Sequence, residues 1–402
     1  MDQTRRDYVL KRGVAEIIVE SEFIELLDAG KQLRLKMGFD PSAPDLTLGH
    51  AVGLRKLRQL QDLGHKVVVI VGDWTAQIGD PSGRSATRPM LTAEQVRSNA
   101  ETYLAQMFKV VDRERTDIKW QSEWFGLFSL ANVIELTSRF TVAQFLARDD
   151  FSKRFKANQP IAITEFLYPL LQAYDSVTVE SDVEFGGTDQ KFNLLVGRDL
   201  QVMMGQRPQQ CFLMPLLVGT DGIQKMSKSL GNYIALSDPP NEMFGKTMSL
   251  PDSAIVTYVE TLTDISDAEV KEMRASLEEG LVNPMELKKL LARELVSHFH
   301  DLKAAVAAAE YFERIVQRKE TPGDSPRFTR PVPSSDGKLR LGHILVETEL
   351  AESVSEAKRL IKQNAVRING IVVEKNIAAS EIESGSLIQS GPLRSVIVGY
   401  EV

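Results

Sequence analysis

The stretch KMGFDPSAPDLTLGH, residues 36–50, decides the fold of this chain. It begins as an apolar strand, expected over 33–39, and ends where a helix of about 49–63 starts. Pro41, Pro44 and Gly49 interrupt regular structure between the two. A second apolar strand, KVVVIVG at 66–72, completes a strand–helix–strand unit. This unit predicts an α/β fold with a parallel sheet and a ligand crevice at the carboxyl ends of its strands.

The start of the predicted helix is a candidate anion site. Apolar residues recur at Val52, Leu57 and Leu60, so one face is buried and the amino end points at the crevice. Helix amino ends attract negative charge. Thr47 and His50 are three residues apart at this end, and we expect both to face the crevice and to touch a polyphosphate.

Composition limits the class of protein. A chain of 402 residues predicts two or three domains. Cys211 is the only cysteine, which excludes internal disulfides and cysteine-based metal sites. No apolar run fits a signal peptide or a membrane span, so we expect a cytoplasmic protein without membrane contact. The net charge of −7 argues against attraction of nucleic acid by the whole surface, and leaves only local basic clusters.

Two segments after the second strand have open interpretations. The loop DWTAQIGDPSGRS at 73–85 carries Asp80 and Arg84, with Arg88 soon after, and these are either solvated loop charges or site residues. Residues 112–160 combine a strand signal with helical stretches and several aromatic residues. They form either ordinary core or a partner surface.

A polar stripe follows on a predicted helix. The sequence TEFLYPLLQAYDSV places Tyr168, Gln172 and Asp175 at spacings of four and three, so they share one face. An ordinary solvent-facing side is the alternative, but the apolar neighbours favour a stripe that faces a cavity. The next motif, GGTDQ at 186–190, is a strand-to-helix turn suited to a ribose or a phosphate, and is a weak signal alone.

The last apolar strand, expected over 211–218, runs into the loop GTDGIQKMSKSLGN. Such loops are commonly solvated connections. Here Lys225 and Lys228 follow the carboxyl end of a strand, where two ammonium groups could close over a triphosphate and stabilise charge that moves during displacement.

In this order, the motifs GFDPSAPDLTLGH, GDPSGRS, EFLYPLLQAYD, GGTDQ and KMSKS resemble those of class I aminoacyl-tRNA synthetases, specifically the bacterial-type tyrosyl-tRNA synthetases. The resemblance covers essentially the whole chain. It implies a Rossmann-like catalytic domain at 1–234 with an inserted segment at 112–160, a helical anticodon-arm domain at 235–320, a linker at 321–337, and a small α+β S4-like RNA-binding domain at 338–402.

The resemblance also implies a reaction and its residues. Tyrosine and ATP would form tyrosyl-adenylate and pyrophosphate, and tRNA(Tyr) would then accept the tyrosyl group. The polyphosphate would be held by Thr47, His50, Lys225 and Lys228, with Arg84 and Arg88 gripping pyrophosphate. The remaining ATP contacts would come from Asp40, Gly49, Gly187, Asp189, Met226 and Ser227. Tyrosine would contact Asp80, Tyr168 and Gln172 through its ammonium group, Gln190 through its carboxyl group, and Asp175 through its phenol.

Two positions depart from the family pattern. Thr47 stands where the family commonly has histidine, although a hydroxyl can still donate to a phosphate oxygen. Lys36 stands where many members have a tyrosine that contacts the substrate hydroxyl. Lys36 could donate to the phenol oxygen, pair with Asp175, or point away, and the sequence leaves these alternatives open.

The C-terminal segment carries the only local basic signal that we single out for RNA. The sequence ILVETELAESVSEAKRLIKQNAVRINGIVV predicts a helix pair, a strand and a turn at Asn369-Gly370, and resembles an S4 module. The expected tRNA contacts are Lys358, Arg359, Lys362 and Arg367. A charged helix face that is merely solvated is the alternative reading.

By the same resemblance we expect a homodimer, with 112–160 as its interface, ATP as substrate together with Mg²⁺, and no tightly bound cofactor or dedicated metal site. Two other functions compete. One is a related enzyme for tryptophan or a small-molecule nucleotidyltransferase, which Asp175, Tyr168, Gln172 and the S4-like tail oppose. The other is a noncatalytic RNA-binding protein, which the intact His50, Lys225 and Lys228 oppose.

Overall fold

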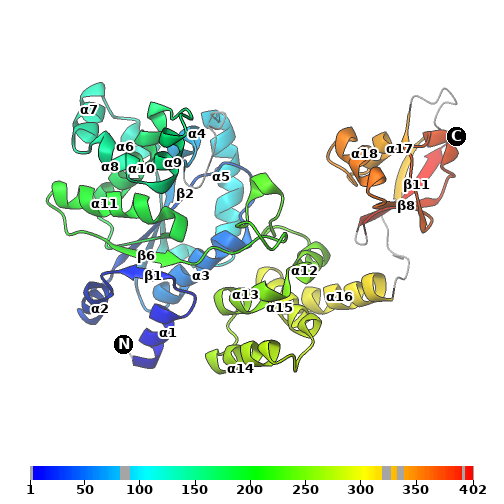
Figure 1. The fold of residues 1–402 in the computed structure, drawn as a ribbon, viewed down its shortest axis with the longest axis horizontal. Helices are drawn as coiled ribbons and strands as arrows, with labels where there is room; N and C mark the ends of the chain where they lie inside the picture. Colours follow the sequence, from blue (N-terminus) through cyan, green and yellow to red (C-terminus); the bar gives the residue numbers. More distant parts are fainter. Residues whose placement is uncertain (1–2, 82–90, 319–326, 333–338, 392–393, 402) are drawn as a thin grey trace. The chain divides into compact units, whose positions relative to one another are not determined.

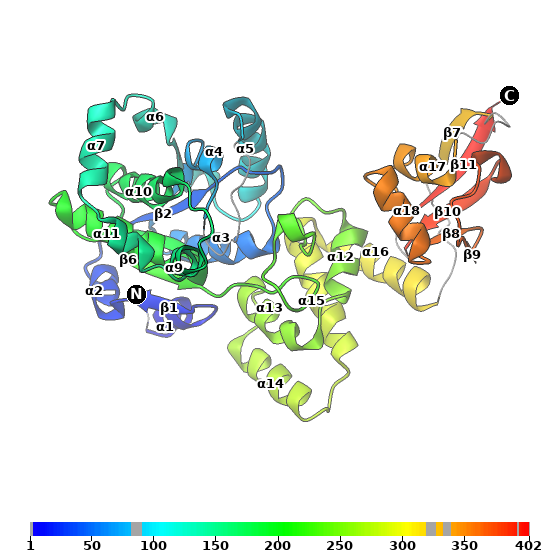
Figure 2. The ribbon, with the colours of Figure 1, turned by 45° about the horizontal axis from the view of Figure 1, so that its top comes forward.

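The structure is a computed structural model, and it describes residues 3–81, 91–318, 327–332, 339–391 and 394–401. Its contacts divide the chain into two compact units, one of residues 1–238 and 249–291 and the other of residues 239–248 and 292–402. Figures 1 and 2 show the elements of both from two directions. Among the described helices, none has the length and apolar character needed to cross a membrane.

The first unit is built on a six-stranded sheet with the order β1-β6-β5-β2-β3-β4. Its strands are β1 (Glu16–Ile18), β2 (Arg34–Phe39), β3 (Lys66–Val71), β4 (Thr116–Trp120), β5 (Val183–Gly187) and β6 (Gln210–Met214). All neighbours are parallel except β1, which runs antiparallel to β6. The chain leaves β2 toward β3 on one side and later returns to β5 on the other. The crevice between the carboxyl ends of β2 and β5 is therefore the switch point at which such folds bind ligands.

Helices cover both faces of this sheet. Successive side chains of β2 point to opposite faces, and each of the two neighbours Lys36 and Met37 meets a different helix. Lys36 faces α10 (Ile163–Thr178), where its ammonium contacts Ser176. Met37 faces α3 (Leu48–Gln61), whose Gly53 leaves room for the Met37 side chain. The predicted strand–helix–strand unit is thus confirmed. The other helices of this part are α1 (Gln3–Lys11), α2 (Glu20–Asp28), α4 (Thr75–Ile78), α5 (Ala93–Met107) and α11 (Lys191–Met203).

Two predicted boundaries differ from the structure. The strand expected over 211–218 ends at Met214 because Pro215 has no N–H for the sheet ladder. Part of the predicted linker is the strand β7 (Arg327–Pro331), which pairs in parallel with β11 (Arg394–Glu401). The prolines of the predicted linker indicated irregular structure. An edge strand nevertheless tolerates proline, so the sequence pattern did not predict β7.

The segment 112–160 contains helices α6 (Ser122–Phe125), α7 (Leu130–Ser138), α8 (Val142–Leu146) and α9 (Asp149–Lys156). Phe125 and Phe145 are buried, so these aromatic residues belong to the core. The exposed apolar side chains are different ones, namely Leu127, Leu130, Ile134, Val142 and Phe155. The segment therefore supplies both core and an apolar surface.

In the sequence, the strands of the two sheets are separated by helices α12 (Pro240–Met248), α13 (Ile255–Leu262), α14 (Asp267–Glu278), α15 (Pro284–Phe299) and α16 (Leu302–Phe312). The division into units cuts across this predicted domain. The Tyr258 hydroxyl of α13 donates to the carbonyl of Val218, and Arg12 of the N-terminal region donates to the carbonyls of Val259 and Thr263. In contrast, α12 packs on α16 within the second unit.

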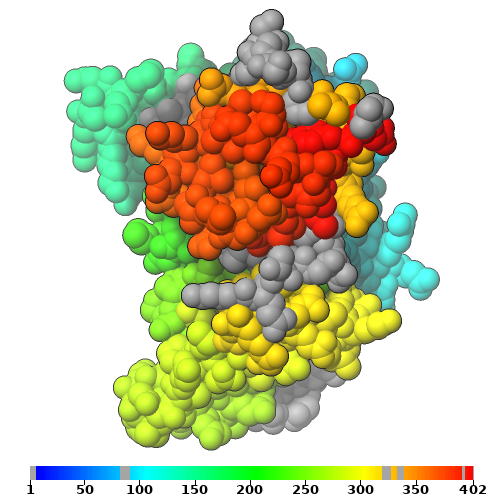
Figure 3. All heavy atoms as spheres, turned by 90° about the vertical axis from the view of Figure 1, so that its right-hand side faces the viewer, coloured from blue at the N-terminus to red at the C-terminus, as the bar shows by residue number. Residues whose placement is uncertain are grey.

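The C-terminal segment has its own core and a five-stranded sheet with the order β7-β11-β10-β8-β9. It contains α17 (Leu341–Glu347), α18 (Val354–Lys362), β8 (Val366–Ile368), β9 (Ile371–Val372) and β10 (Ser386–Ser390). Asn369 and Gly370 both have positive φ, at 50° and 82°, as the predicted hairpin turn requires. In the space-filling view, this segment is the orange to red body that faces the viewer (Figure 3).

Candidate functional site

A cavity of about 730 Å³ lies at the carboxyl ends of the parallel strands in the first unit. It brings together side chains from β2, α3, α10, the turn after β5 and the loop after β6. The predicted site residues that line it are Asp40, Thr47, Gly49, His50, Asp80, Tyr168, Gln172, Asp175, Gly187, Asp189, Gln190, Lys225, Met226, Ser227 and Lys228.

One end of the cavity is formed by the amino end of α3. His50 Nδ1 accepts hydrogen bonds from the Thr47 backbone N–H at 3.1 Å and lies 2.9 Å from the Thr47 hydroxyl. Burial, and next the charges of Lys228 and Lys225, lower the pKa of His50 to about 3. The ring is therefore neutral, and its proton is on Nε2. The Thr47 hydroxyl contacts His50 in this structure, so it would have to exchange this contact for a phosphate oxygen in order to act as the expected phosphate donor.

The two loop lysines lie at this same end. Lys225 forms an ion pair with Asp189 at 2.5 Å, so a phosphate-binding candidate and a ribose-binding candidate contact each other. Lys228 donates to the carbonyl of Asp45 at 2.8 Å and contacts the phenol of Tyr103. The Met226 N–H donates to the carbonyl of Leu217, which ties the loop to the segment that follows β6. Lys225, Lys228 and the Nε2–H of His50 thus line one part of the cavity, which suits an anion.

Asp40 is held at the centre of the cavity by two donors. The Tyr168 hydroxyl donates to one carboxylate oxygen at 2.8 Å and the Thr75 hydroxyl donates to the other at 2.7 Å. A side chain at Gly72 would place a Cβ 2.3 Å from both Asp40 and Thr75, so glycine is required there. Burial, and next the charge of Asp40, raise the pKa of Tyr168 well above its usual value. The phenol therefore stays protonated and donates to Asp40.

Asp175 lies at the other end of the cavity and is 2% exposed. One carboxylate oxygen accepts from Gln121 Nε2 at 2.8 Å, and the other accepts from Trp124 Nε1 at 3.2 Å. Burial raises the pKa of Asp175 to about 7, against the opposing effects of Lys36 and Gln121. The group is a buried acceptor that lines a partly apolar space, and a ligand with a hydroxyl at its end would supply the missing proton donor.

Sequence analysis missed Gln121, although a signal was available. It follows β4 directly, and residues after the carboxyl ends of parallel strands meet at the ligand edge. The side-chain amide oxygen of Gln121, Oε1, accepts from the Thr75 N–H at 2.9 Å and the Trp74 N–H at 3.2 Å. Those bonds fix the amide, so that its NH₂ group must point at Asp175. Tyr103 was also missed, and it lines the cavity, packs against the ring of His50 and contacts Lys228.

Asp80 and Gln190 lie together on the cavity wall. Gln190 Nε2 donates to Asp80 at 2.6 Å, and the Gln190 oxygen accepts from Asn193 at 3.1 Å. An amide held at both ends has a fixed orientation. Asp80 therefore offers a negative charge on the side of the cavity where Tyr168 also lies, which suits a cationic ligand group.

Lys36 is the predicted site residue that the structure does not bring to the cavity. It is fully buried and is absent from the cavity lining. Its ammonium lies 2.9 Å from Glu184 Oε1 and also donates to Ser176 Oγ and to the Gln172 carbonyl. These three acceptors use all of its protons. A direct contact of Lys36 with a ligand, or an ion pair with Asp175, is therefore corrected to a contact behind the cavity wall.

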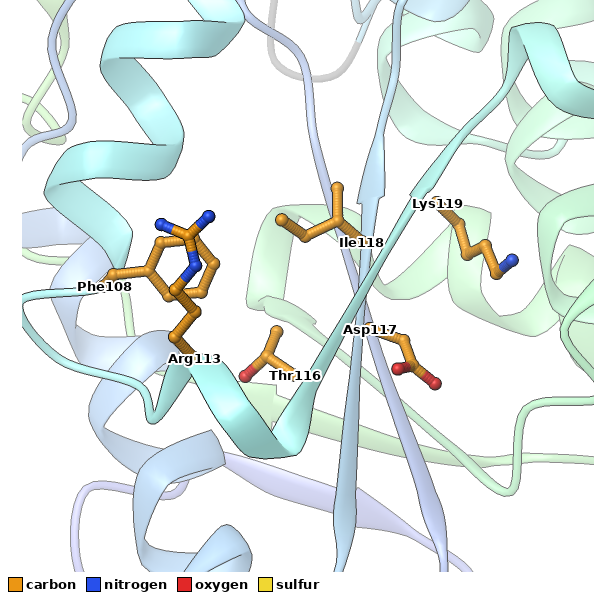
Figure 4. A pocket seen from close by; sticks show the side chains of 6 residues that line it. All are labelled: Phe108, Arg113, Thr116, Asp117, Ile118 and Lys119. Carbon is orange, nitrogen blue, oxygen red and sulfur yellow. The ribbon is translucent and has the colours of Figure 1, made fainter.

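Arg84 and Arg88 lie outside the residues that the structure describes. A second cavity, of about 320 Å³, lies beside β4, where the guanidinium of Arg113 stands over the ring of Phe108 (Figure 4). It shares no residue with the first cavity. Within the described ranges, no group of three or more histidine, cysteine, aspartate or glutamate side chains is arranged to hold a metal ion.

The basic cluster of the C-terminal segment is exposed. Lys358, Arg359 and Lys362 lie on α18 and Arg367 lies on β8, and all four have exposed side chains. Arg359 pairs with Glu356 at 3.2 Å, but 65% of its side chain is still accessible. The cluster is available to a phosphate backbone.

Comparison with known sequences identifies the family of the chain. Residues 28–317 match the family described as "tRNA synthetases class I (W and Y)", and residues 339–376 match the S4 domain. The chain is 58% identical over 388 residues to the tyrosine–tRNA ligase of Dehalococcoides mccartyi strain CBDB1, covering 96% of this chain and 97% of that one. It is 52% identical to the tyrosine–tRNA ligase of Thermotoga maritima, covering 91% and 90%.

Solved structures share the fold. The tyrosyl-tRNA synthetase of Archaeoglobus fulgidus, crystallised with L-tyrosine, aligns with a TM-score of 0.61 at 22% identity, covering 76% of this chain and 99% of that one. A truncated mitochondrial tyrosyl-tRNA synthetase of Aspergillus nidulans gives a TM-score of 0.63 at 20% identity, covering 77% and 93%. The resemblance read from the motifs is confirmed. The chain belongs to the class I tRNA synthetases, in the family of bacterial tyrosine–tRNA ligases with a C-terminal S4 domain.

Proposed function

We infer that the chain activates L-tyrosine with ATP, forming tyrosyl-adenylate and pyrophosphate, and then transfers the tyrosyl group to the 3′ end of tRNA(Tyr). The observation that carries the amino-acid identity is Asp175, a buried carboxylate held open to the cavity by Gln121 and Trp124. Phenylalanine would bring no donor to the acceptor capacity of this carboxylate that Gln121 and Trp124 leave unused. Sites built for a hydroxyl reject the analogue that lacks it, a rule for which tyrosyl-tRNA synthetases are themselves the usual illustration.

The other end of the substrate fits the remaining polar groups. The Tyr168 hydroxyl donates a hydrogen bond to Asp40, so its oxygen can accept from the substrate ammonium, and Asp80 adds a negative charge. Gln172 contributes an amide to the same wall. We assign the substrate carboxyl group to Gln190.

Catalysis in this proposal needs no covalent enzyme intermediate. MgATP is the substrate, with its adenosine beside Asp40, Gly49, Gly187 and Asp189, and its polyphosphate at the amino end of α3. His50 is neutral and donates from Nε2 to an oxygen of the reacting phosphate, while Lys225 and Lys228 stabilise charge that develops on the leaving pyrophosphate. Lys225 must exchange Asp189 for phosphate when the nucleotide enters. We assign Arg84 and Arg88 to the same leaving group.

Amino-acid-dependent exchange of pyrophosphate into ATP tests this function. Tyrosine should support exchange, whereas phenylalanine and tryptophan should support little. Exchange that prefers tryptophan would identify the sister enzyme. A protein that binds tRNA but shows no exchange with any amino acid would support the noncatalytic alternative instead.

The S4 segment is proposed to bind the tRNA backbone. Replacing Lys358 and Arg359 with alanine should weaken tRNA binding and reduce the dependence of log Kd on log salt by about 1–2, because each lost phosphate contact removes roughly one released counterion. Pyrophosphate exchange should not change. Glu356→Ala serves as a control on the same helix. Unchanged tRNA affinity and salt dependence in the double variant would remove this assignment.

We propose that two chains associate through the exposed apolar side chains of the segment 112–160. Leu127→Asp combined with Leu130→Asp should place charge in that interface and shift the protein from dimer to monomer in sedimentation velocity experiments. Val202, an exposed apolar residue of α11, is the control position for an aspartate substitution. A wild type that sediments as an active monomer would contradict the proposal. Since the reaction uses tRNA and ATP, we place the protein in the cytoplasm.

A further inference from the structure

We propose that Lys36 and Glu184, a buried ion pair behind the cavity wall, are positioning residues that turn the carboxamide oxygen of Gln172 toward the substrate ammonium. This inference rests on the proposed function, because it concerns how that site recognises the amino group of its amino acid. Neither residue lines the cavity.

The pair is built into the sheet. Lys36 of β2 lies directly opposite Glu184 of β5 in the parallel register, so both side chains point to the same face. Lys36 is 0% exposed and Glu184 is 1% exposed, and their charged groups lie 2.9 Å apart. Two facing strands thus deliver opposite charges to one point beneath α10.

All the hydrogen-bonding capacity of the pair is used. Glu184 Oε1 accepts from Lys36 and from Gln172 Nε2 at 3.0 Å. Glu184 Oε2 accepts from Ser176 Oγ at 3.1 Å and from Gln209 Nε2. Lys36 also donates to the backbone carbonyl of Gln172 at 2.8 Å, so the pair holds this residue by both its main chain and its side chain.

These bonds decide which way the Gln172 amide faces. A carboxylate can only accept, so the group that faces Glu184 must be the NH₂ of Gln172. The amide oxygen then diverges from the pair, and in the described part of the chain no donor satisfies it, while Gln172 lines the cavity. An oxygen in this position accepts from an ammonium group. The reversed amide would present NH₂ to a cation and repel it.

Stability alone does not account for the pair. Removing two charges from water is costly, and hydrophobic replacements of buried ion pairs are often neutral or stabilising. The pair also lies between the sheet and Gln172, and both of its members contact Gln172 directly. Lys36 is fully buried and lies behind the cavity wall, where it cannot contact the ligand directly.

The test uses the variant Lys36→Met combined with Glu184→Gln, since either single change would leave one buried charge unpaired and could prevent folding. In this double variant the residue at 184 can donate as well as accept, so the Gln172 amide is no longer fixed. The control is Arg154→Met combined with Glu165→Gln, which removes a buried ion pair between α9 and α10 that lines no part of the cavity.

Affinities should be measured for tyrosine, for tyramine, which keeps the ammonium and lacks the carboxylate, and for 3-(4-hydroxyphenyl)propionate, which lacks the ammonium. We expect the Lys36/Glu184 variant to lose roughly tenfold or more in affinity for tyrosine and for tyramine, as for one hydrogen bond to a charged group. Its affinity for the propionate should match that of the wild type, and its kcat at saturating tyrosine should be retained. The control variant should bind all three like the wild type.

Equal losses for all three compounds in the Lys36/Glu184 variant would mean general damage to the cavity and would overturn the inference. Unchanged affinity for tyramine would overturn it as well. In both cases the proposed function would stand, because the wild type would still bind tyrosine. A wild type that binds neither tyrosine nor tyramine would overturn the proposed function and this inference together.

Discussion

Replacing Asp175 with asparagine should reduce kcat/KM for tyrosine by about 30- to 150-fold, which corresponds to the roughly 2–3 kcal/mol of a hydrogen bond to a charged group. The substitution keeps the size of the side chain and removes its charge. Phenylalanine should be activated as well as before or better, because no ionised acceptor is then left unpaired. Pyrophosphate exchange with both amino acids measures the change in preference.

The pH dependence of tyrosine binding gives a second readout of the same residue. Burial raises the pKa of Asp175 to about 7, so the carboxylate is ionised above that pH and protonated below it. Because the ionised form accepts the phenol proton, tyrosine affinity should be full at pH 8 and should fall below pH 7, by up to about tenfold per pH unit. Phenylalanine binding and the Asp175→Asn variant should lack this dependence. A wild-type profile that is flat from pH 6 to 8 would contradict the role of Asp175.

Replacing Lys225 and Lys228 together with alanine should slow adenylate formation by at least about a hundredfold, the loss typical of removing a preorganised donor to a developing charge. Both lysines lie beside His50 at the amino end of α3, whereas Asp175 lies beside Gln121 and Trp124, so the Kd for tyrosine should not change. Single-turnover formation of adenylate measures the rate, and tyrosine-induced fluorescence change measures the affinity.

Lys119→Ala is a matched control for this pair, since the Lys119 side chain is 46% exposed, like that of Lys225, and lies outside the cavity. It should leave both quantities unchanged. A double variant that forms adenylate at the wild-type rate would remove the loop lysines from the mechanism. A loss of tyrosine affinity equal to the loss of rate would show that the loop supports the cavity and does not act on phosphate.

Much of the fold could be predicted because its local patterns agree with its tertiary contacts. The strands at 34–39 and 66–71 and the helix between them have a period and length that allow few alternatives. The site residues were found where motifs follow strand ends. Edge elements were harder, since β7 contains a proline that is permitted only because the strand is paired on one side.

The roles of individual side chains were less predictable than their positions. Sequence spacing placed Lys36 on the first strand, but its partner Glu184 is 148 residues away and is set opposite it only by sheet register. The same holds for Gln121 and Asp175, which meet across 54 residues. Thr47 and His50 are close in sequence, yet the contacts between them depend on how α3 begins, and spacing alone does not predict these contacts.

The most direct measurement is a crystal structure of the protein with bound L-tyrosine. The account predicts the phenol oxygen within hydrogen-bonding distance of the Asp175 carboxylate, about 2.5–3.0 Å, with Lys36 still paired to Glu184 and out of contact with the ligand. A tyrosine whose hydroxyl group meets some other residue, while Asp175 remains bonded only to Gln121 and Trp124, would contradict the claim that this carboxylate selects the amino acid.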